Sequence, residues 1–341
     1  MGDDDSDYII AKKVELCTQF FANTDSHTSF AFKDLKKNEE LNSVRLNPGK
    51  LDMIPYDVES VAQNYVKQNG ETPRIFYALG TYYYETFLLF GDRWIKPEVE
   101  LMSLAKVNLK TAVDTGFYNA RTAQRYANLC MESGLYSEAS VYYEKSIALN
   151  DTNADALYNY ALSLMSSGKY DEGIEPAKKA AVAYKDNKAF QLDAYLLVAD
   201  AYMYLNNFKQ SEKELLQLKN DFPESYLPDM KLGDLYSSQH RMSQANDAYL
   251  SAYKKNPGEL QWFYQTLGMY VNYGFLQDGI SLCRSAINSV EKDGSVKGYL
   301  YTFLANLQIE AKDKKSALVS IDNAEKCFAS AGVTNLAESL E

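Results

Sequence analysis

Residues 231–257, KLGDLYSSQHRMSQANDAYLSAYKKNP, decide the fold class of this chain. Apolar and small side chains recur every three to four residues on both sides of a short polar turn, which predicts two helices. Gly233 on the first helix and Ala245 on the second are small, and the larger Tyr236 and Tyr249 follow them. Because two helices approach closely only where small side chains meet, this pattern predicts a tightly packed antiparallel pair.

The same skeleton recurs along most of the chain at intervals of 34 or 38 residues. The small residue of each first helix stands at Gly80, Ala127, Ala161, Ala199, Gly233 and Ala305. The matching residue of each second helix stands at Ala105, Ala139, Gly173, Ser211, Ala245, Gly279 and Ala317. One expected small position is filled by Leu267 with Gly268 beside it, which leaves a one-residue slip of that helix open.

Turn and capping residues agree with this division. Gly134, Gly168 and Gly274 fall between the two helices of their repeats. Ser137, Asp171 and Ser243 stand where the second helices are expected to need N-caps.

On these residues the chain resembles the tetratricopeptide repeat family. The resemblance covers residues 74–331, in about seven copies. It implies an all-α fold, a right-handed superhelical solenoid of antiparallel helix pairs in which each repeat packs only on its neighbours.

The remaining segments are predicted from composition and periodicity. Residues 1–7 are acidic and predicted to be disordered, residues 8–70 form an N-terminal helical cap or degenerate repeats, and residues 332–341 form a C-terminal tail. The first repeat carries an insertion at residues 86–97. It is either a lid or partner site, or it lengthens the helices that pack on the N-terminal segment, and we prefer the second interpretation.

Bulk composition excludes several classes of protein. Hydrophobic residues make up 46% of the chain and charged residues 24%, which is enough apolar surface for a packed core. The net charge of −11 and the lack of a basic stripe argue against nucleic-acid binding. No run of about 18 apolar residues is present, so no membrane-spanning helix is expected.

Cysteine spacing and the chain ends bear on the compartment. Cys17, Cys130, Cys283 and Cys327 lack metal-site spacing and are predicted to be buried free thiols. Met1-Gly2 and Leu340-Glu341 resemble cloning scars, and the acidic start is typical of the segment after the lipid-bearing cysteine of a bacterial lipoprotein. On this interpretation the protein carries a lipid anchor, and the bacterial periplasm or envelope is favoured over the cytoplasm. The free cysteines, in contrast, favour a reducing compartment.

Motifs for catalysis are not found. The two histidines, His27 and His240, have no sequence neighbours that would make a metal or catalytic site, and His240 is expected in a surface turn. No phosphate-binding loop, dinucleotide fingerprint or nucleophile elbow occurs. We therefore expect no catalytic, cofactor-binding or metal-binding residues and no enzyme activity.

The resemblance also implies a binding surface, because the first helices of this family line a concave groove that holds peptides. Counting from each small position gives the expected groove residues Tyr77, Tyr84, Arg121, Asn128, Tyr158, Met165, Asp193, Asp200, Met203, Met230, Asp234 and Tyr264. Methionines and aromatic rings suit an apolar partner, and the aspartates favour lysine or arginine. The expected partner is a protein or peptide segment that is apolar with basic residues. The alternative is an accessory or carrier subunit that encloses a small apolar ligand in a cavity lined by Met and Tyr.

One family subtype binds the acidic tails of chaperones through a carboxylate clamp. Asn128 and Asn159 fit two of its positions, but Gln124, Asp193 and Leu197 stand where cations are required. Since an acidic groove repels an acidic tail, this subtype is excluded.

Overall fold

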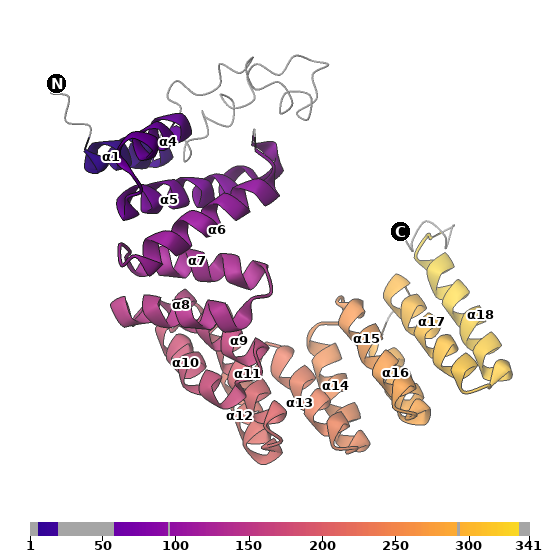
Figure 1. Cartoon of the computed structure of the whole chain (residues 1–341). Helices are drawn as coiled ribbons and strands as arrows, with labels where there is room; N and C mark the ends of the chain where they lie inside the picture. The colour runs from indigo at the N-terminus through magenta and orange to yellow at the C-terminus, as the bar shows by residue number, and fades with distance from the viewer. Residues whose placement is uncertain (1–5, 20–57, 95, 292–293, 334–341) are drawn as a thin grey trace, which may run out of the picture. The chain divides into compact units, whose positions relative to one another are not determined.

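The computed structural model describes residues 6–19, 58–94, 96–291 and 294–333, and every regular element within them is helical (Figure 1). The chain divides into two bodies, Met1–Asn187 and Lys188–Glu341. Most of the predicted acidic start, the 20–57 part of the predicted cap with His27, and nearly all of the predicted tail lie outside the described residues.

Among its described residues, the first body contains two leading helices and three helix pairs. Its elements are α1 (Asp7–Cys17), α4 (Val58–Asn69), α5 (Pro73–Phe90), η3 (Gly91–Arg93), α6 (Glu98–Asp114), α7 (Ala120–Glu132), α8 (Tyr136–Leu149), α9 (Ala154–Ser166) and α10 (Tyr170–Ala183). Helices α5 and α6, α7 and α8, and α9 and α10 pack on each other as pairs.

The described part of the second body contains four further pairs. Its elements are α11 (Lys188–Tyr204), α12 (Phe208–Asp221), α13 (Leu227–Ser238), α14 (Met242–Lys255), α15 (Leu260–Asn272), α16 (Leu276–Ser289), α17 (Ser295–Glu310) and α18 (Lys314–Ser330). The odd-numbered helices from α5 onward are the first helices of the repeats, and the even-numbered ones from α6 onward are the second helices.

Small residues lie where the paired helices cross, as the sequence predicts. A Cβ atom added at Gly233 would lie 2.4 Å from the ring of Tyr249, and one at Gly80 would lie 2.8 Å from Leu109. These distances are far below van der Waals contact, so glycine is required for the close approach. The prediction of an all-α fold built from sequential helix pairs is confirmed.

Left-handed residues close the turns between paired helices. Gly134, Gly168 and Gly274 have φ angles of 69°, 83° and 79°, and His240 takes the same conformation with a φ of 59° in its own turn. A residue with positive φ at the C-terminal end of a helix reverses the chain direction in few residues. His240 is exposed, in agreement with its predicted place in a surface turn.

The predicted N-caps of the second helices are wrong. Helices α8, α10 and α14 begin one residue before Ser137, Asp171 and Ser243, and no side chain caps them. The amide of Leu135 already donates to the carbonyl of Cys130 at 2.8 Å, so the turn passes directly into α8. The amides of Lys169 and Arg241 do the same in their turns, at 2.9 Å.

Longer first helices explain the longer intervals. Helices α11 and α17 have 17 and 16 residues, whereas α7, α9 and α15 have 13. The extra length is about one helical turn. Leu267 is buried and Gly268 is exposed, so the register continues through α15 without a slip.

The 86–97 segment lengthens the first pair of helices. Helix α5 has 18 residues and α6 has 17, and the ring of Phe90 lies 4.7 Å from the buried Trp94 between them. The amide of Glu98 donates to the Asp92 carboxylate at 3.1 Å, which caps the start of α6. Helix α1 packs on both α4 and α5.

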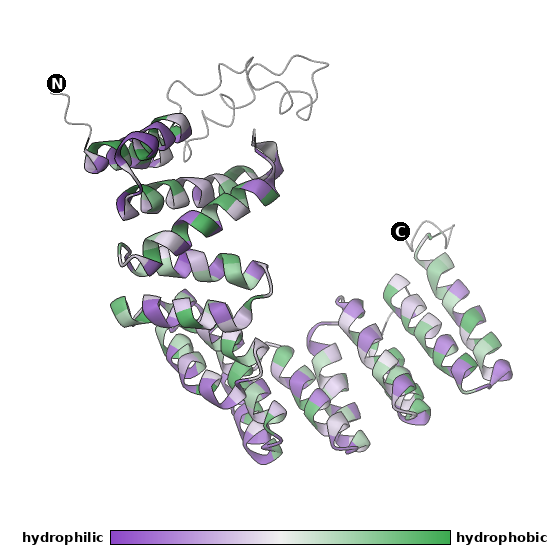
Figure 2. Ribbon diagram, viewed as in Figure 1, coloured by the Kyte–Doolittle hydropathy of each residue, from purple (hydrophilic) through white to green (hydrophobic). Residues whose placement is uncertain are grey.

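Hydrophilic and hydrophobic residues alternate along each helix, and the apolar ones form the cores of the two bodies (Figure 2). Within the described ranges, no helix has both the length and the apolar character needed to cross a bilayer. All four cysteines are buried free thiols, as predicted.

Candidate partner-binding surface

On the first helices of the first body, several predicted groove residues bond to the chain itself. Tyr84 is buried, and its hydroxyl accepts a hydrogen bond from the Asn128 side chain at 2.9 Å. The hydroxyl of Tyr143 on α8 donates to the amide oxygen of Asn128 at 2.6 Å. Asn128 therefore joins α5 to both helices of the next repeat, and burial raises the pKa of Tyr84.

A buried ion pair lies beside this network. Arg125 on α7 pairs with Glu85 on α5 and also donates to the Thr81 hydroxyl at 3.2 Å. Arg121, one turn earlier on α7, lies 3.6 Å from the same carboxylate, with a side chain that is 74% exposed. Of the predicted residues in this body, Arg121 is therefore the one most accessible to a partner.

In the second body, Lys231 interacts with two of the predicted groove residues, Asp200 and Asp234. Its ammonium lies 2.8 Å from Asp200, and Asp234 contributes to its electrostatic environment. The hydroxyl of Tyr249 donates to Asp234 at 2.7 Å, just as Tyr143 donates to Asn128 in the first body. Asp200 and Asp234 therefore have structural partners, and the negative potential expected from them is partly neutralised.

Burial and pairing act in opposite directions on these charges. Burial raises the pKa of Asp200 against the attraction of Lys231, and burial likewise raises the pKa of Asp234 against its bond from Tyr249. Burial acts to lower the pKa of Lys231, but Asp200 and Asp234 outweigh it and leave that pKa raised.

Sequence reasoning missed the cations, although their positions follow a rule. Arg125 and Lys231 each lie two residues before the small residue of their first helix. Each reaches the residue that follows the small one in the preceding repeat, Thr81 or Asp200. A cation two residues before one small residue, together with a polar or acidic residue just after the small residue of the preceding repeat, could have indicated these contacts from the sequence.

The remaining predicted residues differ in accessibility. Met165 is buried against Gly173, whereas Tyr77, Tyr158, Asp193, Met203 and Met230 are half-buried. Tyr77 packs edge-on against Phe117, and Tyr158 against Tyr184. Asp193 borders an apolar pocket of about 400 Å³ that Leu192, Phe222 and Leu227 also line.

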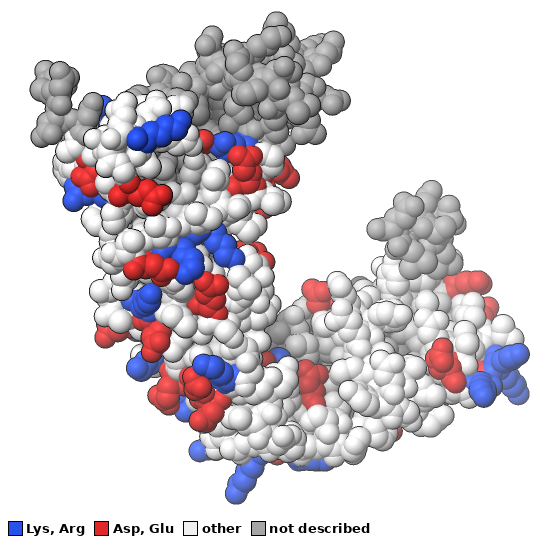
Figure 3. Space-filling view, viewed as in Figure 1, with Lys and Arg blue, Asp and Glu red and all other residues white. Residues whose placement is uncertain are grey.

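Among the predicted groove residues, the most exposed aromatic side chain is that of Tyr264 on α15. Tyr264 is 52% exposed, and its ring centroid lies 4.9 Å from that of Phe303. Together with Gly268 they line a pocket of about 390 Å³. On the side in view in Figure 3, the surface over α13 to α17 is mostly uncharged, whereas lysines and arginines alternate with acidic residues over α5 to α10.

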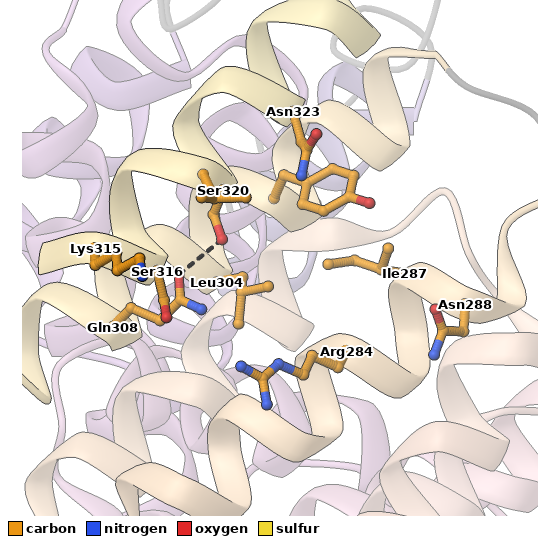
Figure 4. Close-up of a pocket in the computed structure, with 11 residues that line it drawn as sticks. Arg284, Ile287, Asn288, Leu304, Gln308, Lys315, Ser316, Ser320 and Asn323 are labelled. Atoms are coloured by element: carbon orange, nitrogen blue, oxygen red, sulfur yellow. Dashed lines mark hydrogen bonds between the residues drawn. The ribbon is translucent and has the colours of Figure 1, made fainter. Parts of the chain in front are cut away.

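A more polar pocket of about 530 Å³ lies between α16, α17 and α18 (Figure 4). Arg284 and Lys315 line it, and Ser320 donates to the buried Gln308 at 2.7 Å. Bonds from Ser316, helped by Arg284 and Lys315, lower the pKa of Asp313. The two cations thus already have an acidic neighbour within the chain.

No group of three or more His, Cys, Asp or Glu side chains is placed to bind a metal within the ranges that the structure describes. Several of the ionisable residues named above, among them Glu85, Arg125, Asp200 and Lys231, form ion pairs between repeats. The arrangement is suited to binding through shape, apolar contact and charge.

Comparison with known proteins gives one family match. Residues 142–175 match the model of the tetratricopeptide repeat. No curated protein matches the chain.

Solved structures with similar folds are distant in sequence. The C-terminal part of a TPR repeat-containing protein from Cytophaga hutchinsonii is 12% identical with a TM-score of 0.49, over 82% of this chain and 98% of that one. Yeast Tom70 is 14% identical with a TM-score of 0.45, over 97% and 67%. YrrB, described as a TPR protein with an unusual peptide-binding site, is 17% identical with a TM-score of 0.37, over 60% and 97%.

Proposed function

Since the chain is a tetratricopeptide repeat protein, we propose that it is a non-enzymatic scaffold or adaptor that holds a segment of a partner protein against its first helices. The observation that carries this proposal is the exposed aromatic surface of α15 and α17, with the pocket beside Tyr264 and Phe303. Exposed apolar surface next to a concave pocket is typical of an interaction site.

The charges favour a partner segment that is apolar with basic residues. Asp193 borders an apolar pocket and forms no ion pair with the described residues. Glu310 borders the pocket beside Tyr264 and likewise has no described cation partner. A lysine or arginine next to an apolar anchor would match both places. Asp200 and Asp234 contribute less, because the attraction of Lys231 already offsets part of their charge.

The alternative function, an accessory or carrier subunit for a small apolar ligand, has less support. It requires a cavity lined by methionine and tyrosine, and the pockets described above beside Asp193, beside Tyr264 and between α16, α17 and α18 have no methionine in their lining. The lipid anchor and an envelope location stay predictions from the sequence.

Partner capture from a native lysate tests the proposal. The double variant Met203→Ser/Tyr264→Ser removes apolar side chains from first helices, and we expect it to lose the partner that the wild type captures. The matched control, Tyr136→Ser/Leu318→Ser, removes exposed apolar side chains from second helices and should retain it. Mass spectrometry identifies the partner, and calorimetry with the purified partner should give a dissociation constant at least about tenfold weaker for the first-helix variant.

Equal capture by both double variants would contradict binding on the first helices. Failure of the wild type to capture any protein, together with a small molecule that stays bound in native mass spectrometry, would favour the carrier function instead.

A further inference from the structure

Gly268 has no packing role within the chain. Six glycines lie inside described α-helices, and at five of them a Cβ atom would meet a neighbour at 3.0 Å or less. At Gly268, in the interior of α15, a Cβ would meet no atom within 4 Å. Glycine inside a helix is destabilising relative to alanine, and close approach of a ligand is one physical reason for keeping it.

The repeat explains what Gly268 leaves empty. It occupies the position after the small residue, which is polar at Thr81, Asn128, Asp200, Asp234 and Asn306 and apolar at Leu162. A residue of the next repeat contacts this position in two cases. Arg125 donates to Thr81, and Lys231 donates to Asp200. By the same spacing, Phe303 faces Gly268, and both line the pocket of about 390 Å³.

Helix α15 also packs less closely on α16, its partner in the repeat, than the helices of the other pairs pack on each other. Leu267 fills the position that is small in other repeats, so α15 and α16 cannot approach as closely as the other pairs do. Large rings occupy the space on its other side, where Phe263 lies 5.0 Å from Tyr253 and Trp262 lies 5.8 Å from Tyr226. These rings hold α15 on that side, and a gap in the form of the pocket of about 390 Å³ lies between its side chains and those of α17.

The residues that line this pocket indicate which kind of side chain would bind in it. Tyr264, Phe303 and Val271 supply apolar walls, Gly268 supplies a bare backbone, and Ile309 is an exposed apolar residue at the edge. Glu310 is the charged residue of the lining, and no lysine or arginine lines the pocket. A bulky apolar side chain fits the walls, and an adjacent cation fits Glu310.

We propose that the pocket between α15 and α17 is the anchor site for one large apolar or aromatic side chain of the partner segment, with a neighbouring lysine or arginine paired to Glu310. This inference rests on the proposed function and names its specificity-determining residue, Gly268.

Substitution of Gly268 by leucine tests the site without removing any contact. The leucine side chain has room in the pocket and raises helix propensity, so the fold should be retained or stabilised, which thermal unfolding checks. The matched control Ser281→Leu places the same side chain at an exposed position of α16. The probes are three pools of short fluorescein-labelled peptides: an apolar centre with flanking lysines, the same centre with flanking glutamates, and a serine centre with flanking lysines.

We expect the pool with an apolar centre and lysines to bind the wild type and the Ser281→Leu control equally in fluorescence anisotropy. Gly268→Leu should weaken this binding at least about tenfold, and the other two pools should bind the wild type weakly. Unchanged binding by Gly268→Leu would overturn this site while leaving peptide binding, and so the proposed function, intact. Equal binding of the serine or glutamate pools, or no binding of any pool, would overturn the stated occupant. The capture of a partner protein from native lysate, described above, tests the proposed function separately.

Discussion

Replacing Gly233 with valine should lower the free energy of unfolding by about 3 kcal/mol or more, because the new side chain has no space. A Cβ at this position would lie 2.4 Å from the ring of Tyr249, which is completely buried. Moving that ring also breaks the bond from its hydroxyl to Asp234. Urea unfolding of the full chain, followed by circular dichroism, measures the loss.

Gly268→Ala is the control for this prediction. It changes a glycine on the next first helix, where the added methyl group meets no atom within 4 Å. The substitution should raise the free energy of unfolding by about 0.5–1 kcal/mol through helix propensity alone. If both glycine variants shifted stability in the same direction, the packing assigned to Gly233 or the open space assigned to Gly268 would be wrong.

Replacing Lys231 with methionine should destabilise the chain by about 3 kcal/mol at neutral pH. The ammonium lies 2.8 Å from Asp200, whose side chain is 22% exposed, and it also offsets the charge of Asp234. Without it, two carboxylates lie together in a largely buried place with no cation. The comparison is again made by urea unfolding, at several pH values.

The pH dependence identifies the cause. Burial already raises the pKa of Asp200 and Asp234 above the ordinary value of 3.8, and loss of Lys231 should raise both further. A carboxyl group whose pKa is raised in the folded state stabilises that state when it is protonated. The loss of unfolding free energy caused by Lys231→Met should therefore shrink as the pH falls from neutral toward 3.8. Adding Asp200→Asn and Asp234→Asn should restore most of the stability, whereas a deficit that did not change with pH would exclude this explanation.

The fold could be predicted from sequence because its determinants repeat. All the crossing positions except that of Leu267 hold Gly, Ala or Ser in phase, and a pattern that recurs so many times can be recognised without any contact information. The N-caps could not be predicted by the same means. Ser137 looked like a cap, but the bond from Leu135 to Cys130 begins α8 one residue earlier, and that bond depends on backbone geometry in the turn.

The candidate surface could be predicted only in part. Counting from the small positions found Tyr264, which is exposed, and also Tyr84 and Asp234, which are held by Asn128 and Tyr249. Whether a side chain bonds to the next repeat depends on both repeats together. The open space beside Gly268 could not be predicted, because the sequence shows a glycine at this repeat position but not whether a neighbouring side chain fills the space.

The most direct test of the account is to place a photo-crosslinking amino acid at Tyr264, on a first helix, and separately at Val141 and Leu318, which are exposed on second helices. Irradiation in the native lysate is followed by mass spectrometry of the crosslinked products. The account predicts that one partner protein is crosslinked from position 264, through a segment with a large apolar residue next to a lysine or arginine, and that neither other position captures it. Crosslinking of the partner from positions 141 or 318 with none from 264 would contradict it.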